Sequence, residues 1–370
     1  MRRSYAVVLA LGFTASASAE LYRTPVYRDI RWLGRADTGV ALISDGTAAF
    51  YNPGGLGKGD SVDISLLNPF VGANRNVYDS AQTFLESNPE SISDYLDPFM
   101  GMPLAAQASY FPYLRLPHFM AGYFIVNAQV MRLRNPVNPE LNIDYRYDRG
   151  VVLGGGFDVA EKLFVGASFR YQKRSMIKDT LSGSIITDLS LDQLLDRLTE
   201  GEGWGLNLGA QYRHELAAGQ ALHFGVAFED IGNTTFRSQT IKKGAPLTQA
   251  TYTSAGFAYT GQVTGFSYAF LLDFKNLSQF DESYSKKVQV GAEVALPVFT
   301  LRGGMHQGYW TAGLSATVLP FLTLDFATYG EELGVAGGQQ DNRYYMLGLQ
   351  MSMELNHKKQ RKQKYTLDHL

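Results

Sequence analysis

Long and short connections alternate between the amphipathic segments of this chain, and this regular layout is its most restrictive feature. From about residue 60 to residue 355, roughly fourteen stretches alternate apolar and polar residues with a two-residue period. In the clearest stretch, Trp204–Tyr212, aromatic and aliphatic side chains share one face, while glycine, asparagine and glutamine share the other. A strand with one apolar face and one polar face suits a wall between lipid and a wet lumen.

The same period continues along the chain, and the connections are of two kinds. Further alternating segments are Leu163–Tyr171, Leu222–Phe228, Phe266–Phe274, Val288–Leu296, Trp310–Val318 and Tyr345–Leu355. Longer connections are expected at residues 76–104, 135–141, 175–203, 231–247, 276–285 and 331–342. Tight turns are expected at Pro112–Pro117, Val159–Lys162, Thr260–Gly265, Leu296–Val298 and Leu319–Phe321, and one short connection, near Gln307–Tyr309, stands where a long one is expected. The pattern predicts an all-β fold, a transmembrane antiparallel β-barrel of about 14 strands as found in bacterial outer membranes.

Composition agrees with a barrel in a membrane. Cysteine is absent, the mean hydropathy is −0.13, and no run reaches the roughly 20 apolar residues of a membrane-spanning helix. The 38 glycines, 22 tyrosines and 22 phenylalanines fit strands that curve and carry aromatic girdles. The alternative, a soluble all-β sandwich or barrel, would need a second sheet to cover the apolar faces. The formal net charge of −2 gives no sign of a nucleic-acid partner.

The chain divides into a leader, a small-residue segment, the barrel and a tail. Residues 1–19 have the pattern of a signal peptide, since Arg2 and Arg3 precede the apolar run Tyr5–Phe13 and Ala17–Ala19 offers a cleavage site. Residues 20–59 lack the two-residue period, residues 60–355 form the barrel, and residues 356–370 are a basic tail. We expect the tail in the periplasm and the longer loops outside the cell. Residues 20–59 are expected inside or across the periplasmic mouth, because unpaired backbone is tolerated in a bilayer only within the barrel.

Two inserts within the barrel have a helical pattern. They are Ala81–Leu96 and Asp188–Leu198, and in the second Leu191, Leu194, Leu195 and Leu198 lie on one face. Both fall in connections that are expected outside the cell. We favour amphipathic helices that cap the barrel mouth, and the alternative is a lid or a surface that gathers ligand.

The segment from Leu33 to Gly57 carries the most specific local signal. Small residues run through it, Asp45-Gly46 is a turn signal, and it ends on Asn52-Pro53-Gly54-Gly55. It resembles the N-terminal signature of the FadL-type outer-membrane transport superfamily. The matching positions are Leu33, Gly34, Asp45, Ala48, Asn52, Pro53, Gly55 and Leu56, and Gly54 stands where the family commonly has alanine. A second resemblance, to the PorV and TraF-like branch, is the run Glu229-Asp230-Ile231-Gly232-Asn233-Thr234.

The resemblance implies a barrel of about fourteen strands whose N-terminal segment folds inward as a hatch. It also implies an outer-membrane channel for hydrophobic small molecules, such as long-chain fatty acids, that pass the hatch and a lateral opening in the wall. The PorV-type branch shares the barrel but serves protein secretion. A binding or assembly protein for a secreted or periplasmic polypeptide is therefore the alternative, with a structural barrel as a third. The expected partners are membrane lipid, the hydrophobic cargo and the outer-membrane assembly machinery, and no nucleic acid.

No catalytic, cofactor or metal site is predicted, so we expect that the chain is not an enzyme. The histidines are scattered, and none lies four residues from another beside an acid, as a zinc site would require. Charged residues of both signs fall on inward registers: Arg170, Arg213, Glu229, Asp273, Lys287, Glu293, Arg302 and Asp325. We interpret them as ion pairs that hold the hatch, because unpaired buried charges are costly, and an ion pathway is the alternative. Gly154–Gly156 is interpreted as a kink or as a wall thinned to admit the hatch.

Overall fold

The structure is a computed structural model of the whole chain. It describes residues 24–59, 61–86, 100–135, 137–182, 191–217, 219–238, 244–334 and 336–355. The expected signal peptide and basic tail, residues 1–19 and 356–370, lie outside the described residues. Among the helices that the structure describes, none is long and apolar enough to span a membrane.

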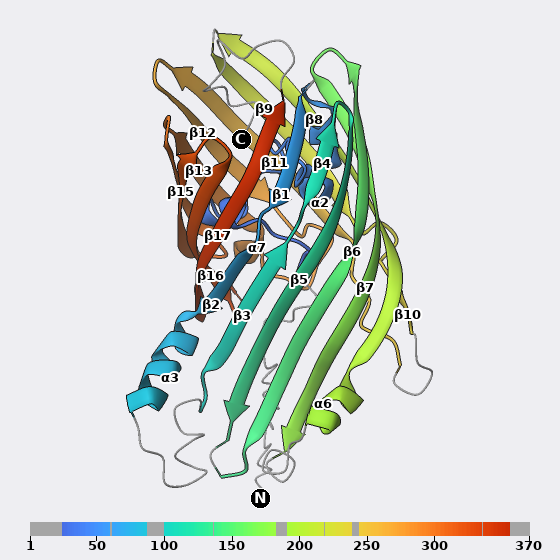
Figure 1. Cartoon of the computed structure of the whole chain (residues 1–370), viewed down its shortest axis with the longest axis vertical. Helices are drawn as coiled ribbons and strands as arrows, with labels where there is room; N and C mark the ends of the chain where they lie inside the picture. Colours follow the sequence, from blue (N-terminus) through green and yellow to red (C-terminus); the bar gives the residue numbers. More distant parts are fainter. Residues whose placement is uncertain are drawn as a thin grey trace, which may run out of the picture.

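One antiparallel sheet of 17 strand segments closes on itself, because β17 (Asp341–Leu355) pairs with both β1 (Val62–Leu67) and β2 (Phe70–Asn74), as Figure 1 shows. The other strands are β3 (Pro103–Tyr110), β4 (Tyr113–Leu116), β5 (Phe119–Arg134), β6 (Glu140–Ala160), β7 (Leu163–Ser182), β8 (Thr199–Ala217), β9 (Gln220–Glu229), β10 (Phe236–Ser238), β11 (Tyr252–Val263), β12 (Phe266–Phe274), β13 (Val288–Ala295), β14 (Phe299–His306), β15 (Tyr309–Leu319) and β16 (Leu322–Glu332). The described helices are α1 (Ile30–Gly34), α2 (Ala48–Tyr51), η2 (Pro53–Gly57), α3 (Arg75–Glu86), α6 (Leu191–Arg197) and α7 (Tyr284–Lys287).

Some strands of the barrel are interrupted, so that two segments occupy the place of one strand. We call each such place in the wall a stave, whether it holds one segment or two, and the 17 segments make 14 staves. β1 and β2 are two parts of one stave, since both pair with β17. β3 and β4 are two parts of the next stave, since both pair with β5. β10 follows β9 along its stave, and both pair with β8. The sequence-based prediction of about 14 strands is confirmed.

Alternation along the staves gives the barrel an apolar outer face and a mixed, largely polar inner face. On β6, Val151 and Leu153 are exposed on the outside, whereas Val152 is buried on the inside. Trp204 and Trp310 are 59% and 57% exposed and lie near the starts of β8 and β15. These exposed aromatic and aliphatic side chains would contact lipid in a membrane.

The two ends of the barrel differ, and we call them the turn end and the loop end. At the turn end, neighbouring staves are joined by a few residues: Pro117-His118, Glu161-Lys162, Thr264-Gly265, Leu296–Val298 and Pro320-Phe321. The loop end carries α3, α6 and α7, and the lower edge of Figure 1 shows α3 and α6 there. One loop-end connection, Gln307-Gly308, is also short, as the sequence indicates.

Two of the expected connections are wrong. Residues 112–117 are not a single tight turn, because Tyr113–Leu116 form β4 and pair with β1 and β5. The connection at 175–203 is much shorter than expected, because β7 continues to Ser182 and β8 begins at Thr199. The prolines at 112 and 117 suggest a turn, but they flank a short strand. In β7 and β8, polar residues interrupt the apolar outer face, so the alternation stops before the strand ladder does.

The helix α6 packs on the outer face of the barrel rather than over its mouth. Leu194 and Leu198 contact a cluster formed by Ile143 of β6 with Ile177 and Leu181 of β7. These strand residues continue the outward-facing register of their strands. The expectation that this helix caps the mouth is therefore wrong, and residues 188–190 of the expected helix lie outside the described residues.

The other expected helix corresponds to α3. It begins at Arg75, directly after β2 and earlier than the predicted Ala81. Residues 87–96 of the expected helix lie outside the described residues.

Candidate functional site: the hatch and the seam

Residues 24–59 lie inside the barrel and are buried almost throughout, and we call this segment the hatch. Its helix α1 contacts β14 to β17, while η2 contacts β5 to β8, so the hatch reaches from one side of the wall to the other. At its start, the Thr24 carbonyl accepts hydrogen bonds from Arg146 (3.1 Å) and Gln249 (3.0 Å). This is the segment whose inward folding the resemblance implies.

Glycines on neighbouring staves let the backbone of the hatch lie directly on the wall. Gly156, Gly166 and Gly209 are register partners on β6, β7 and β8. A Cβ on Gly166 would lie 2.1 Å from the Pro53 carbonyl oxygen, and one on Gly209 would lie 1.9 Å from Asn52 Oδ1. Any side chain at these two positions would push the hatch away from the wall.

The same close approach is found at other positions. On β6, a Cβ on Gly154 would meet Leu56 at 2.6 Å, and one on Gly156 would meet the amide nitrogen of Gly57 at 2.4 Å. These close approaches favour a wall thinned beside the hatch over a kink as the interpretation of this glycine run. The predicted motif glycine Gly34 makes a similar contact, with 2.8 Å between its ideal Cβ and the Cα of Gly313. Leu33 beside it is fully buried.

Asn52 fixes the sharp reversal of the hatch and attaches it to the wall. Its side chain accepts a hydrogen bond from the Gly54 amide (3.0 Å) and donates to the carbonyls of Val40 (2.6 Å) and Ala210 of β8 (3.0 Å). Pro53-Gly54-Gly55 then form the first turn of η2, and all of them are buried. The predicted motif residues thus shape the hatch and its contact with the wall.

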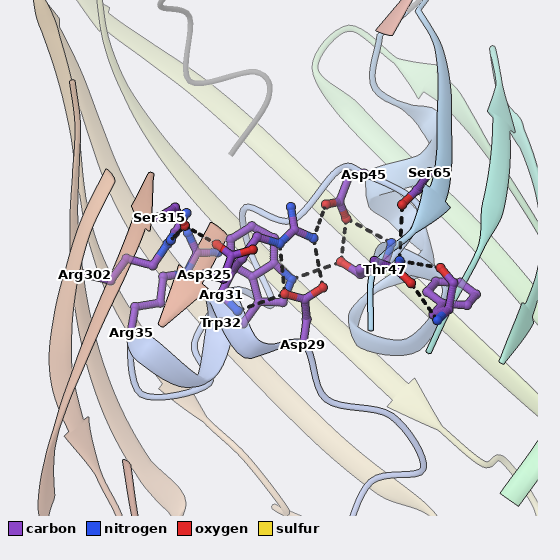
Figure 2. A network of polar contacts seen from close by, with 12 residues as sticks. Asp29, Arg31, Trp32, Arg35, Asp45, Thr47, Ser65, Arg302, Ser315 and Asp325 are labelled. Carbon is purple, nitrogen blue, oxygen red and sulfur yellow. Dashed lines mark hydrogen bonds and ion pairs between the residues drawn. The ribbon is translucent and has the colours of Figure 1, made fainter. Parts of the chain in front are cut away.

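Asp45 lies in a polar network around Trp32 (Figure 2). Its carboxylate accepts hydrogen bonds from the amide and hydroxyl of Thr47, at 2.9 and 2.5 Å, and from Arg31 at 2.8 Å. The indole of Trp32 donates to the Thr47 hydroxyl at 3.0 Å. Arg31 is shared with Asp29, at 2.9 Å, so this network joins the beginning and the middle of the hatch.

A second part of the network joins the hatch to the wall. Arg35 of the hatch and Arg302 of β14 both donate to the carboxylate of Glu293, at 2.9 and 2.7 Å. Arg302 also donates to Ser315 at 2.5 Å, and the Ser315 hydroxyl donates to Asp325 (Figure 2). The predicted inward residues Glu293, Arg302 and Asp325 therefore meet at one place, where they hold α1.

Asp37 is a further anchor of the hatch. Its carboxylate lies 2.8 Å from the Lys275 ammonium and 3.9 Å from the Arg28 guanidinium, and it accepts a 2.6 Å hydrogen bond from Tyr51. Burial alone would raise the pKa of Asp37, but Lys275 and Arg28 outweigh it and hold this pKa below its ordinary value. Asp273, another predicted inward residue, accepts hydrogen bonds from two consecutive hatch amides at 2.7 and 3.1 Å.

The remaining predicted charges lie elsewhere on the wall. Arg170 of β7 forms an ion pair with Asp230, the second residue of the run Glu229–Thr234. This pair lies within the barrel and fixes the turn between β9 and β10, so the run has a structural explanation. Arg213 is half-buried near the turn end, and Lys287 donates to a carbonyl in the connection between β12 and β13 at 2.6 Å.

The wall is broken beside the hatch, between the β1/β2 stave and the β3/β4 stave. The ladder between β1 and β4 ends at Ser65, and the ladder between β2 and β3 begins at Phe70. Residues 66–69 and 110–112, all of them described, have no ladder pair with one another, and we call this gap the seam. Pro69 and Pro112 lie in the two segments, and proline has no N–H to give to a ladder.

Asn68 bridges the seam with its side chain. Its Oδ1 accepts a hydrogen bond from the amide of Phe111 at 2.7 Å, and its Nδ2 donates to the Phe111 carbonyl. The Tyr110 hydroxyl adds a 2.9 Å hydrogen bond to the Leu66 carbonyl. The resemblance implies a lateral opening in the wall but not its place, and prolines within two neighbouring strands are the sequence signal that could have located the seam.

Behind the seam, the interior is apolar. Phe111 is fully buried, and its ring centre lies 5.1 Å from those of Tyr27 and Phe50 in the hatch and 5.3 Å from that of Tyr113. On the outer face of the seam, Leu66 is 64% exposed. Apolar side chains therefore lie on both faces of this break in the wall.

Two cavities adjoin the hatch. One of about 30 Å³ lies against its first residues and is lined by Arg28, Arg146 and Gln107 among others, so it has room for only one or two water molecules. The other, of about 240 Å³, is lined largely by polar and charged groups, including Arg115 and Glu354. Neither cavity suits a hydrophobic molecule while the side chains stand as they do. The described residues include no group of histidines and carboxylates arranged to hold a metal ion.

No protein-family model matches the chain, and no curated protein sequence matches it. Solved structures do match. The CymD monoaromatic hydrocarbon channel is 14% identical, with 90% of this chain and 99% of that chain covered and a TM-score of 0.49. The deltaS2 mutant of the TodX monoaromatic hydrocarbon channel is 12% identical, with 89% and 98% covered and a TM-score of 0.50. A FadL homologue of Pseudomonas aeruginosa is 14% identical, with 88% and 97% covered and a TM-score of 0.43.

The class of protein is thus a closed antiparallel β-barrel of 14 staves with a segment folded into its bore. More particularly, the chain has the fold of the TodX deltaS2 mutant, and this agrees with the fold that the sequence resemblance to the FadL type implies. Likeness at this identity defines the fold, and the function has to be argued from the site.

Proposed function

We propose that this protein is a non-enzymatic outer-membrane channel from which hydrophobic small molecules pass sideways into the bilayer at the seam. The observation that carries the proposal is the seam itself. In a wall that faces lipid, backbone groups without a ladder partner must be satisfied in another way, and here the side chains of Asn68 and Tyr110 bond Phe111 and Leu66 across the seam. The wall gives up ladder hydrogen bonds at this break, and apolar residues lie on both of its faces. Such a break suits a gate for apolar cargo.

The hatch is held too firmly for cargo to pass straight along the bore. Its backbone lies against wall glycines, and its Arg35 and Asp37 are buried in ion pairs with the wall. Removing one partner of such a pair costs about 3–5 kcal/mol. Opening the seam breaks no buried ion pair: Asn68 releases Phe111, Tyr110 releases Leu66, and the Phe111 ring turns aside. The TodX variant that shares this fold is named as a monoaromatic hydrocarbon channel, which agrees with an apolar cargo.

A second candidate function is a PorV-like binding or assembly protein that serves protein secretion. The filled bore favours it, since the cavities beside the hatch are small or polar. A binding platform, however, has no use for a wall break that exposes apolar residues on both sides. The seam therefore ranks transport first.

We also propose that the barrel lies in the outer membrane with a defined orientation. Val62 at the start of β1 pairs with Leu355 at the end of β17, so the barrel begins and ends at the turn end. Export and assembly begin in the periplasm, so the turn end is assigned to the periplasm and the loop end to the outside of the cell. The assembly machinery of the outer membrane is then a required partner during insertion.

Uptake measurements test the proposal. Cells or proteoliposomes with and without the barrel are given a fluorescent long-chain fatty acid, toluene, and a hydrophilic dye. The expected result is faster entry of the hydrophobic probes with the barrel present and no change in dye entry. Equal entry of both hydrophobic probes with and without the barrel would contradict transport.

A further inference from the structure

A row of charged side chains crosses the outer face of neighbouring strands, just beyond the apolar belt. Arg149 of β6, Lys173 of β7, Glu202 of β8 and Arg237 of β10 are register partners in that order. Figure 1 shows the strands β6 and β7 extending to the loop end at its lower edge. Three of these side chains are basic and one is acidic.

The position of the row is defined by its neighbours along the same strands. Two residues closer to the turn end, on the same outer face, Val151, Tyr171 and Trp204 are also register partners. The rings of Tyr171 and Trp204 are 4.6 Å apart, and Trp204 also stacks on Phe169 at 4.9 Å. Such an aromatic row marks the level where hydrocarbon gives way to lipid head groups. The charged row therefore lies at head-group level.

Two of the basic residues directly oppose each other. Arg149 and Lys173 are register partners, and like charges in this relation destabilise a sheet. Lys173 has partial compensation, with its ammonium 3.7 Å from the Glu202 carboxylate. Among the described residues, Arg149 and Arg237 have no carboxylate within ion-pair distance. In the part of the chain that the structure describes, Arg149 therefore has no anion beside it.

The outer face beyond the row is polar rather than apolar. Tyr147 of β6 is in register with Asn127 of β5 and Ser175 of β7, two residues closer to the loop end. The Ser175 hydroxyl donates to Glu200 of β8 at 3.1 Å, and these hydroxyl, amide and carboxylate groups would face a bulky polar head group such as a sugar. Guanidinium and ammonium groups bind phosphate oxygens well, and the Arg guanidinium can form a bidentate pair of hydrogen bonds with a phosphate.

We propose that Arg149 and Lys173, flanked by Arg237, bind a phosphate of a phosphorylated glycolipid in the outer leaflet, with the sugar against Tyr147 and Ser175. The assignment to the outer leaflet rests on the orientation in the proposed function, but the site itself does not depend on transport. Bound glycolipid supplies an anion next to Arg149, which has no carboxylate partner among the described residues. It also ties the extended β6–β8 side of the barrel to the membrane surface.

Binding is tested on the purified, folded barrel in a non-ionic detergent. The protein is incubated with bisphosphorylated lipid A, with dephosphorylated lipid A, or with phosphatidylglycerol, and retained lipid is counted by native mass spectrometry. We expect the bisphosphorylated glycolipid to be retained about 10–30-fold better than the dephosphorylated one, and Arg149→Ala/Lys173→Ala to remove that preference. Arg149→Lys/Lys173→Arg, which keeps both charges, should retain it. Lys162→Ala, at the turn end, is the matched control and should behave like the unchanged protein.

Each other outcome overturns the assignment. Equal retention of the two lipid A forms by the unchanged protein shows adventitious lipid only, and this comparison needs no variant. Equal retention of phosphatidylglycerol shows a general phosphate contact and removes the glycolipid. Both measurements on the unchanged protein separate the two proposals. Normal uptake of the hydrophobic probes without a preference for bisphosphorylated lipid A defeats only this inference, whereas absent uptake with a normal preference defeats only transport.

Discussion

The side chain of Asn68 replaces the missing ladder hydrogen bonds between two staves, because it hydrogen-bonds both the backbone amide and the backbone carbonyl of Phe111. The hydrogen bond from the Phe111 amide to Asn68 Oδ1 is 2.7 Å long. The two residues come from neighbouring strands of the barrel that have no ladder pair at this position. The ring of Phe111 covers the inner face of the seam, while the Asn68 side chain joins the two staves across it. Any change at either residue should alter how often the seam opens.

Asn68→Ala should loosen the seam without unfolding the barrel. The backbone amide and carbonyl of Phe111 would lose their partners in an apolar setting, at about 1–3 kcal/mol for each group. We expect several-fold faster entry of the hydrophobic probes and a lower melting temperature. Asn76→Ala is the control, since Asn76 also donates to a backbone carbonyl, that of Pro103 at 2.9 Å, but away from the seam. Unchanged probe entry in the Asn68 variant, with the control also unchanged, would argue against the gate.

Phe111→Ala should create a dry cavity behind the seam. The ring packs against Tyr27, Phe50 and Tyr113, and its removal is expected to cost about 3–5 kcal/mol of stability. Because an apolar cavity of this kind binds small aromatic molecules, toluene should raise the melting temperature of the variant but not of the unchanged protein. Phe280→Ala, at a side chain that is 92% exposed, is the control. No toluene-dependent shift would mean that the cluster collapses into the space.

Gly209→Ala should displace the hatch. A Cβ at this position would lie 1.9 Å from Asn52 Oδ1, which cannot be accommodated without movement of the hatch backbone or the wall. We expect increased entry of small hydrophilic dyes through a barrel that still folds. In Gly303→Ala the added carbon meets only a carbonyl oxygen at 3.6 Å, so dye entry should not change. Equal dye entry in the two variants would contradict the close docking of the hatch.

The alternation of residues along each strand was enough to predict the outward faces, and exposed Trp204 is one example. It could not predict contacts that depend on residues far apart in the chain. Asn68 and Phe111 are 43 residues apart, and Arg35 and Glu293 are 258 apart. From the sequence, an inward-facing charged residue indicates only that it needs a partner of opposite charge. Which residue is that partner depends on how the hatch packs in the closed barrel. The motif resemblance located the hatch, whereas the seam has no counterpart in a pattern of single strands.

The docking of the hatch should depend on pH in a defined direction. Because Lys275 and Arg28 hold the pKa of Asp37 below its ordinary value, the stabilisation is fully present above roughly pH 3.9 and is lost as the pH falls through the lower pKa of the folded state. Dye entry should therefore be constant from pH 8 to about 5 and rise only below about pH 4. Asp37→Asn should admit dye already at neutral pH, while Asp79→Asn, on the exposed face of α3, should not. Dye entry that rises between pH 7 and 5 in the unchanged protein would contradict this anchor.

Locking the seam tests the central claim most directly. The chain has no cysteine, so Asn68→Cys/Phe111→Cys allows one disulfide across the seam, and Ala73→Cys/Ala106→Cys, at register partners of the same two staves, gives a matched disulfide outside it. Hydrophobic-probe entry is measured for each variant before and after reduction. Lateral transport predicts that the oxidised seam variant is inactive and recovers on reduction, while the control pair is active in both states. Equal probe entry through the oxidised and reduced seam would show that cargo does not leave the barrel between Asn68 and Phe111.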